Sequence, residues 1–337
     1  MTNKRFSLLI NEDDNTANAL ASQPNKEERA RFTLKTKETE KETEKIPFSR
    51  KVQYWSLEKK AFFLHRTYGL QINYDNKKTI HYLLEVKCEG YKKGIFDYSL
   101  QRKQFFKDGE ELGGFMEQLA AQSASCLYPL KVKVNKLGQI INVTNQEEIK
   151  ERWEAKQKEL AKRYTGKPFV NYCKKITEVV NSSEKIVKSL GNDVGYDILF
   201  SEIYMNYTKK FSQSLEKGFK WFSGVQKVNF YGNQSVNPIL KENKRMLITY
   251  KGNMKPVGGL EKGETQIKYE LDAKDNSLLR VDGTFNYVQN NVDKTIQFKA
   301  IWQESMDKTV AQQIAYEKQK GMYFDENSEK KWYQLWK

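Results

Sequence analysis

The chain is poor in the residues that most active sites require. Its 337 residues include two histidines, His65 and His81, and three cysteines, Cys88, Cys126 and Cys173. An odd number of widely spaced cysteines excludes a disulfide framework and a zinc site. We therefore expect three reduced cysteines that fill apolar positions, as buried free cysteines usually do.

The chain also lacks the short motifs of common catalytic and nucleotide-binding sites. It contains no glycine-rich phosphate loop, no HExxH, no GxSxG and no EF-hand loop. The pattern S-x-x-K occurs, but 48 lysines make it expected by chance, and its companions S-D-N and K-T-G are missing. We therefore predict a protein that is not an enzyme and that has no catalytic residues, no cofactor and no metal.

Two enzymatic alternatives stay open at this point. His65 and His81 fall in neighbouring predicted strands, and His81 shares a polar strand face with Glu85. A His–Glu pair can move protons, although a third group that orients it is missing. Glu85, Glu270 and Asp282 lie on polar strand faces, and paired carboxylates can hydrolyse glycosides. Acidic side chains that point outward from strands are normally solvated, which counts against this alternative.

Long apolar runs are missing as well. No stretch reaches about 18 consecutive apolar residues, so we expect no membrane-spanning helix. The N-terminal region has neither the long apolar segment nor the small-residue cleavage site of a secretory signal, and it has no lipid-anchoring cysteine. We expect a cytoplasmic protein as the sequence is written, with export by a non-classical route as the alternative.

What the chain does have is aromatic residues and basic charge. It contains 6 Trp, 19 Tyr and 18 Phe and carries a net charge of +15. Aromatic side chains bury large apolar areas, so a substantial core is expected despite a mean hydropathy of −0.80. Only 10 of the 58 basic residues are arginine, and the excess charge is spread along the chain. Arginine is the usual tool for phosphate recognition, so we expect weak polyanion binding, with nonspecific nucleic-acid binding as a lesser alternative.

The two ends of the chain read as segments outside the folded domain. Residues 1–50 carry ten basic and nine acidic groups and few apolar ones, which favours a disordered tail. Residues 307–337 are predicted to form a short helix followed by an aromatic end. Each end has one apolar cluster that we interpret as a candidate partner-binding segment. These clusters consist of Phe6, Leu8, Leu9 and Ile10, and of Trp332, Tyr333, Leu335 and Trp336.

Between the ends, the hydrophobic period changes twice. Residues 51–144 alternate with a period of two, most clearly in 80–88, where every second residue from Ile80 to Cys88 is apolar. Strands are predicted at 52–55, 61–74, 80–88, 95–106, 130–134 and 139–143, with a short helix within 109–125. Residues 145–218 follow a helical period, with helices predicted at 145–165, 169–190 and from 194 to 211. Residues 219–306 alternate again, and strands are predicted at 228–231, 246–250, 265–271, 278–287 and 295–302.

Segregated runs of strands and helices indicate an α+β fold rather than an alternating α/β fold. We predict a single domain over residues 51–306, built as a large curved antiparallel sheet or open barrel of about nine to eleven strands. A block of about three amphipathic helices should cover it.

Three functions are compatible with these features. The first is a non-enzymatic interaction protein, an adaptor or structural component of a larger bacterial assembly such as a secretion or injection machine, with other proteins as partners. The alternatives are a carrier with a helix-capped cavity for a lipid or small molecule, and the nonspecific nucleic-acid binder.

Overall fold

The computed structural model describes residues 42–45, 54–60, 64–222, 224–241 and 244–303. Both predicted partner-binding clusters, at 6–10 and 332–336, and the predicted helix after Asp307 lie outside the described residues. Among the described helices, none combines the length and the apolarity needed to cross a membrane.

One antiparallel sheet of eleven strands dominates the structure, in the order β7-β6-β5-β4-β3-β15-β14-β13-β12-β10-β9. The first half of the chain supplies β3 (His65–Tyr74), β4 (Lys78–Lys92), β5 (Ile95–Lys107), β6 (Leu130–Val134) and β7 (Ile140–Val143). The second half supplies β9 (Ser212–Phe219), β10 (Val228–Val236), β12 (Arg245–Met254), β13 (Leu260–Asp272), β14 (Leu278–Gln289) and β15 (Val292–Trp302). Each half is a meander of hairpins, and the pairing of β15 with β3 joins the two into one sheet.

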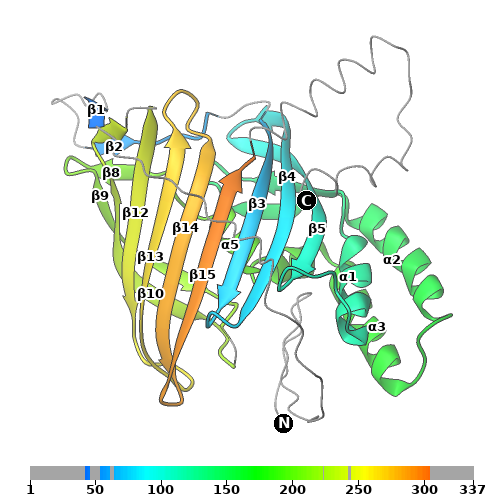
Figure 1. Cartoon of the computed structure of the whole chain (residues 1–337). Coiled ribbons are helices and arrows are strands. Elements are labelled where there is room, and N and C mark those ends of the chain that lie inside the picture. Colours follow the sequence, from blue (N-terminus) through cyan, green and yellow to red (C-terminus); the bar gives the residue numbers. More distant parts are fainter. Residues whose placement is uncertain (1–41, 46–53, 61–63, 223, 242–243, 304–337) are drawn as a thin grey trace, which may run out of the picture.

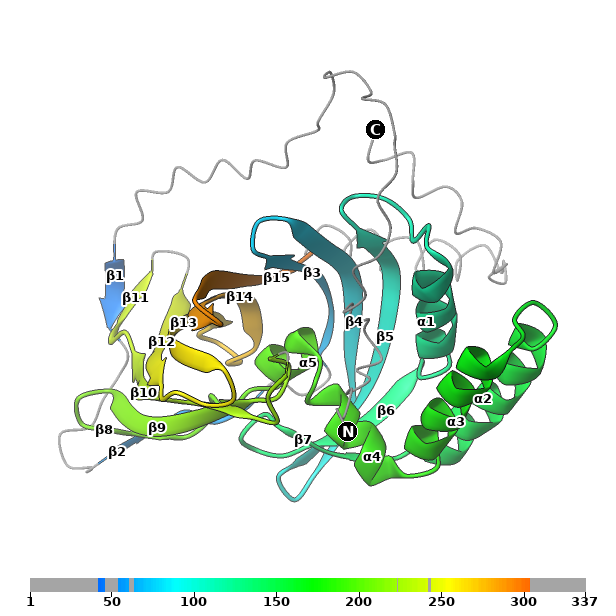
Figure 2. The same cartoon turned by 90° about the horizontal axis from the view of Figure 1, so that it is seen from below.

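Five helices pack against the sheet: α1 (Phe115–Ser125), α2 (Gln146–Leu160), α3 (Lys167–Val180), α4 (Ser183–Leu190) and α5 (Val194–Leu199). Figure 1 shows α1, α2 and α3 together beyond β5, on one side of the molecule. Seen from below, the sheet curls strongly, and α5 lies inside its curve (Figure 2). The predicted α+β class, with a large curved antiparallel sheet and a helical block, is confirmed.

Two short strand pairs lie outside the main sheet. β2 (Tyr54–Ser56) pairs with β8 (Asn206–Thr208), and β1 (Glu42–Lys45) pairs with β11 (Ile239–Lys241). β1 falls within residues 1–50, which we expected to be a tail.

The predicted helix boundaries differ from the structure in three places. The helix expected over 145–165 ends at Leu160. The single helix expected over 169–190 is two helices, because Ser182 begins a new one by accepting a hydrogen bond from the backbone N–H of Lys185 at 3.3 Å. The helix expected from 194 to 211 ends at Leu199, and Tyr207 lies in β8 instead. β9 was missed because the inward row of this strand includes a charged residue, Lys217, which obscures the alternation.

Inward and outward residues alternate across the whole sheet. The pairing places Ile72 opposite Ile80 and Phe298, and the predicted apolar face of 80–88 points inward. The same rows run through β14 and β13, where Phe285 and Tyr269 are fully buried. A sheet this curved turns one face inward on itself, so that face forms the core with the helices.

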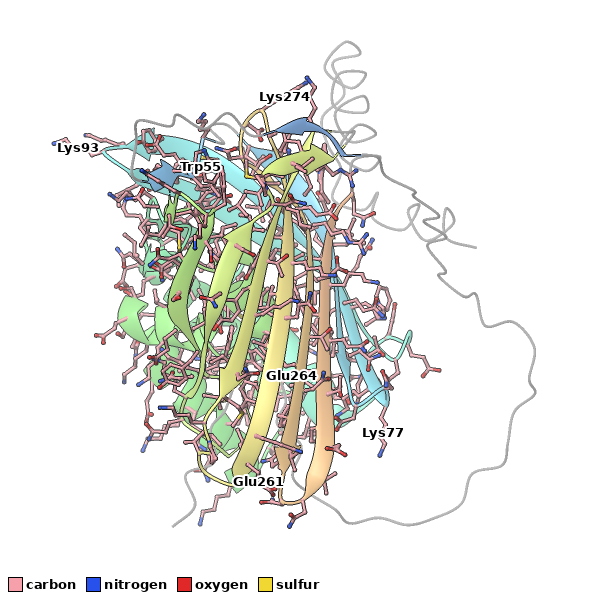
Figure 3. The ribbon with its side chains drawn as sticks, turned by 90° about the vertical axis from the view of Figure 1, so that its left-hand side faces the viewer. Trp55, Lys77, Lys93, Glu261, Glu264 and Lys274 are labelled. Carbon is pink, nitrogen blue, oxygen red and sulfur yellow. The ribbon has the colours of Figure 1, made fainter. Side chains whose placement is uncertain are left out.

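The sheet has two distinct ends. Figure 3 shows Lys93 and Lys274 at one end and Lys77 and Glu261 at the other. Trp55 of β2 lies at the Lys93 end and packs on Tyr207, with ring centroids 5.9 Å apart.

Candidate ligand site on the concave face

The histidines are far apart and lie on the outer face. His65 pairs across β3 and β4 with Lys87, whereas His81 pairs with Gln71 near the other end of the same two strands. His65 Nε2 lies 2.5 Å from Glu85 Oε1, and Lys103 Nζ lies 3.0 Å from Glu85 Oε2. The hydrogen bond from His65 and the charge of Lys103 hold the pKa of Glu85 at about 2. Glu85 is therefore the ionised centre of a surface ion cluster.

The outward carboxylates of the second half also lie in ion pairs. Arg245 contacts Glu270 at 3.3 Å, and Arg280 contacts Asp282 at 2.5 Å. Such pairs are the usual fate of acidic residues on a solvated strand face. The three cysteines are free and buried, and no group of three or more acidic, histidine or cysteine side chains in the described residues could hold a metal ion.

The unusual charges lie on the inner, concave face. Arg102 of β5 pairs with Leu84 of β4 and so points inward with the core residues of both strands. The carbon at the centre of its guanidinium lies 5.2 Å from the ring centroid of Phe105, 5.3 Å from that of Tyr128 and 5.8 Å from that of Tyr82. Within the described residues, Arg102 donates no hydrogen bond and forms no ion pair, and its side chain is partly exposed. An arginine held by rings alone still has all five N–H donors to offer.

Two of these rings are tyrosines whose hydroxyls lie in a small polar network. The hydroxyl oxygens of Tyr128 and Tyr196 lie 2.6 Å apart, and the Tyr82 hydroxyl donates to Asp193 Oδ1 at 3.5 Å. Burial raises the pKa of Tyr82 and of Tyr196 well above the usual range, so both hydroxyls stay protonated at neutral pH. We name Arg102, Tyr82, Tyr128, Tyr196 and Phe105 the Arg102 cluster.

Asp193 positions α5 beside this cluster. Its Oδ1 accepts hydrogen bonds from the backbone N–H groups of Gly195 at 2.8 Å and Tyr196 at 3.4 Å, which caps the helix. Burial raises the pKa of Asp193, and the positive charge of Arg102 opposes that rise. The two side chains form no direct ion pair, although each charge shifts the pKa of the other group. The carboxylate oxygen that accepts hydrogen bonds is used by the helix and by Tyr82.

A second inward cation lies toward the Lys93 end. Lys59 Nζ is 4.7 Å from the ring centroid of Tyr204, 5.5 Å from that of Tyr98 and 5.7 Å from that of Phe96. Burial lowers the pKa of Lys59 to about 8. Like Arg102, it has no hydrogen-bonding or ion-pair partner in the part of the chain that the structure describes.

Other inward cations have partners within the protein. Arg66 of β3 donates to the carbonyl oxygen of Leu278 at 2.7 Å. The side-chain nitrogen of Lys217 in β9 donates to Ser201 Oγ at 2.8 Å and to the carbonyl oxygen of Glu202 at 3.0 Å. Lys217 is 7% exposed, and burial lowers its pKa to about 8. Nearby, burial raises the pKa of Asp197 to about 7, although Trp221 Nε1 donates a hydrogen bond to this carboxylate at 3.0 Å. Because these groups have partners, they are less available to a ligand than Arg102 and Lys59.

Burial of Lys217 should make stability depend on pH. Its pKa falls from 10.5 in the unfolded chain to about 8 in the folded one, so the unfolded chain binds the proton more tightly between these values. The free energy of unfolding should therefore increase as the pH rises above about 8. This increase should disappear when the pH is brought back below about 8. The rise due to Lys217 should be about 1.5 kcal/mol by about pH 9.5, below the range in which tyrosines of the unfolded chain ionise.

Urea unfolding of Lys217→Met across this pH range measures the effect. The variant should lose its share of the rise, whereas Lys268→Met, which removes an exposed lysine from β13, should keep the whole of it. Identical pH profiles for Lys217→Met and the wild type would show that Lys217 keeps its proton in both states.

The inward cations were not predicted from the sequence, because candidate site residues were expected on the polar strand faces. The signal was present, since Phe96, Tyr98, Leu100 and Arg102 form one alternating row, and Leu215, Lys217 and Phe219 form another. A charge in an otherwise apolar row is the mark of a buried ionisable group.

The fold and this site define a class: an α+β protein built on one large curved antiparallel sheet, with an aromatic interior that contains cations. Comparison with protein-family models finds no match, and no curated protein matches the chain. Among solved structures, the chain is similar to one described as lipid–protein interactions in lipovitellin, with 8% sequence identity and a TM-score of 0.43. The similarity covers 72% of this chain and 25% of that one, so the chain spans about a quarter of the lipovitellin chain. A likeness at this TM-score carries no weight for function, which depends on the side chains described above.

Proposed function

We propose that the protein is a non-enzymatic carrier of an amphipathic anion, a molecule with an apolar chain and an acidic headgroup. The observation that carries the proposal is Arg102, an inward-pointing guanidinium without a hydrogen-bonding partner among the described residues. The headgroup would meet Arg102, and the chain would lie against the aromatic concave face.

The chemistry of the Arg102 cluster supports an acidic headgroup. A guanidinium presents a planar fork of donors that matches a carboxylate or a phosphate, and the bond is strongest where water is excluded. The rings of Tyr82, Tyr128 and Phe105 already hold the guanidinium in place. A site whose donor is preorganised loses little conformational entropy when the ligand binds.

The side chains next to Arg102 on the concave face suit an apolar chain in character. Lys59 lies on the same face among three rings, and Leu100 separates Tyr98 from Arg102 along β5. Apolar walls with a few polar groups are typical of small-molecule sites.

The test uses oleate as the probe. Full-length protein should bind oleate saturably in titration calorimetry, and native mass spectrometry of protein purified under mild conditions should show a copurifying amphiphile. Arg102→Met should weaken oleate binding at least about tenfold, since a hydrogen bond to a charged group contributes about 1.5–3 kcal/mol. Arg280→Met, which removes an arginine paired with Asp282 on the outer face, is the matched control and should bind as the wild type does.

Several results would contradict the carrier proposal. A wild-type protein that neither binds oleate nor carries a copurifying amphiphile would end it, and so would equal losses in Arg102→Met and Arg280→Met. Copurification of another protein in place of an amphiphile would favour the interaction-protein hypothesis. That hypothesis stays a prediction, because its docking residues at 6–10 and 332–336 lie outside the described residues.

A further inference from the structure

The α2–α3 hairpin has an outer tip that lies away from the sheet. The two helices run side by side, and the loop that joins them lies at the outer edge of the molecule in both views (Figures 1 and 2). Trp153 of α2 is fully buried and donates a hydrogen bond to Thr177 Oγ1 of α3 at 2.8 Å. This contact fixes the two helices against each other, so the tip is held on a rigid support.

Apolar side chains are exposed at this tip. Val170 of α3 is 62% exposed, and Phe115 and Met116 at the start of α1 are 57% and 48% exposed. Phe115 belongs to the same end of the block, because its ring centroid lies 4.8 Å from that of Tyr164 in the hairpin loop. Large apolar side chains grouped on a surface mark a site of contact with something apolar.

The same tip is strongly basic. Within residues 156–175, seven side chains are basic and one, Glu159, is acidic. The basic residues are Lys156, Lys158, Lys162, Arg163, Lys167, Lys174 and Lys175. Glu159 is 2.6 Å from Lys156, so its charge is already compensated. The start of α2 is acidic instead, with Glu147, Glu148, Glu151 and Glu154. The tip is therefore a locally basic surface within a helical block whose other end is acidic.

We propose that the tip of the α2–α3 hairpin, together with the start of α1, docks on the surface of an anionic lipid bilayer. Phe115, Met116 and Val170 would enter the headgroup region while the surrounding lysines meet acidic lipids, the combination that holds peripheral proteins on membranes. The inference rests on the proposed function for its purpose, since membranes are a source of amphipathic anions. Its evidence is separate, because none of these residues belongs to the Arg102 cluster.

Vesicle co-sedimentation of the full chain tests the inference. The protein should bind vesicles of phosphatidylcholine with about one third phosphatidylglycerol, and it should bind pure phosphatidylcholine at least about tenfold more weakly. Binding should also fall steeply at about 0.5 M salt, where charges are screened.

Two variants separate charge from apolar insertion. Lys162→Glu/Arg163→Glu/Lys167→Glu should abolish binding to the anionic vesicles, and Phe115→Ser/Val170→Ser should weaken it at least about tenfold. The matched control, Lys251→Glu/Lys262→Glu/Lys268→Glu, makes the same change in net charge with three exposed lysines of β12 and β13 and should still bind. Circular dichroism and oleate titration of each variant check that the concave face remains folded.

Equal binding of the tip variants and the wild type would overturn the inference, and so would equal losses in the control variant. Binding of the tip to an acidic protein or a nucleic acid, with no binding to anionic vesicles, would overturn it too. If wild-type protein docks on vesicles but never binds oleate, the carrier proposal fails while the docking surface stands.

Discussion

Replacing Phe285 by Ala should lower the free energy of unfolding by about 4 kcal/mol, within the range for truncating a large buried aromatic side chain. Phe285 of β14 is fully buried. Its ring centroid lies 4.8 Å from that of Trp221, 5.0 Å from that of Phe219 and 5.8 Å from that of Phe230. The three partners come from two strands and the segment between them, so the cavity would open where these elements meet and could not close by a shift of one side chain.

Equilibrium unfolding in urea, followed by near-ultraviolet circular dichroism, measures this loss. Tyr231→Ala is the matched control, because Tyr231 is an aromatic residue of β10 that is 44% exposed. The control should lose less than about 1 kcal/mol, as surface substitutions generally do. A similar loss in both variants would mean that the aromatic cluster does not hold the second half of the sheet together.

The strands were predictable because each carries its own evidence. In β4, β6 and β14 every second residue is apolar, and hairpin turns follow, so the period and the turns specify the element without knowledge of the rest of the chain. The same holds for α2, where acidic residues follow Asn145 and a helical stripe contains Ile149 and Trp153.

Other elements depend on contacts that the sequence does not display. β9 is an edge strand that pairs with β10, and its inward row contains Lys217, which is stabilised by Ser201 and the backbone of Glu202. The helix expected to continue past Leu199 ends there, and the next residue, Phe200, packs edge-on against Tyr98 of β5 with ring centroids 6.4 Å apart. Propensity is overridden in both places by tertiary contacts.

The Arg102 cluster could not be predicted from the sequence, because it too depends on tertiary contacts. Its members come from β4, β5, the segment before β6 and the first turn of α5, which are brought together only when the sheet curls and α5 enters the curve (Figure 2). Alternation alone could have marked Arg102 as an inward charge. Its lack of a hydrogen-bonding partner among the described residues depends on the side chains around it, which no spacing specifies.

α5 can pack closely against the sheet because Gly195 has no side chain. A Cβ atom at this position would lie 2.0 Å from the Tyr82 hydroxyl oxygen and 3.1 Å from Leu70 Cδ2. The Tyr82 ring cannot turn aside easily, because it is buried and stacked on Phe105 with centroids 5.9 Å apart. Any side chain at residue 195 must therefore move α5 away from the sheet, and Asp193 and Tyr196 would move with it.

Gly195→Ala should accordingly lower the free energy of unfolding by about 3 kcal/mol, near the upper end for overpacking. The variant should also weaken oleate binding at least about tenfold, because Tyr196 would no longer lie in its place in the Arg102 cluster. Gly283→Ala is the matched control, since a Cβ atom there would meet its neighbours at 3.7 Å or more, which is ordinary contact. Urea unfolding measures the loss of stability in the two variants, and oleate titration measures their affinity for oleate. If Gly195→Ala unfolds and binds as Gly283→Ala does, α5 is free to shift, and the tyrosine hydroxyls around Arg102 cannot be the fixed frame that holds a headgroup.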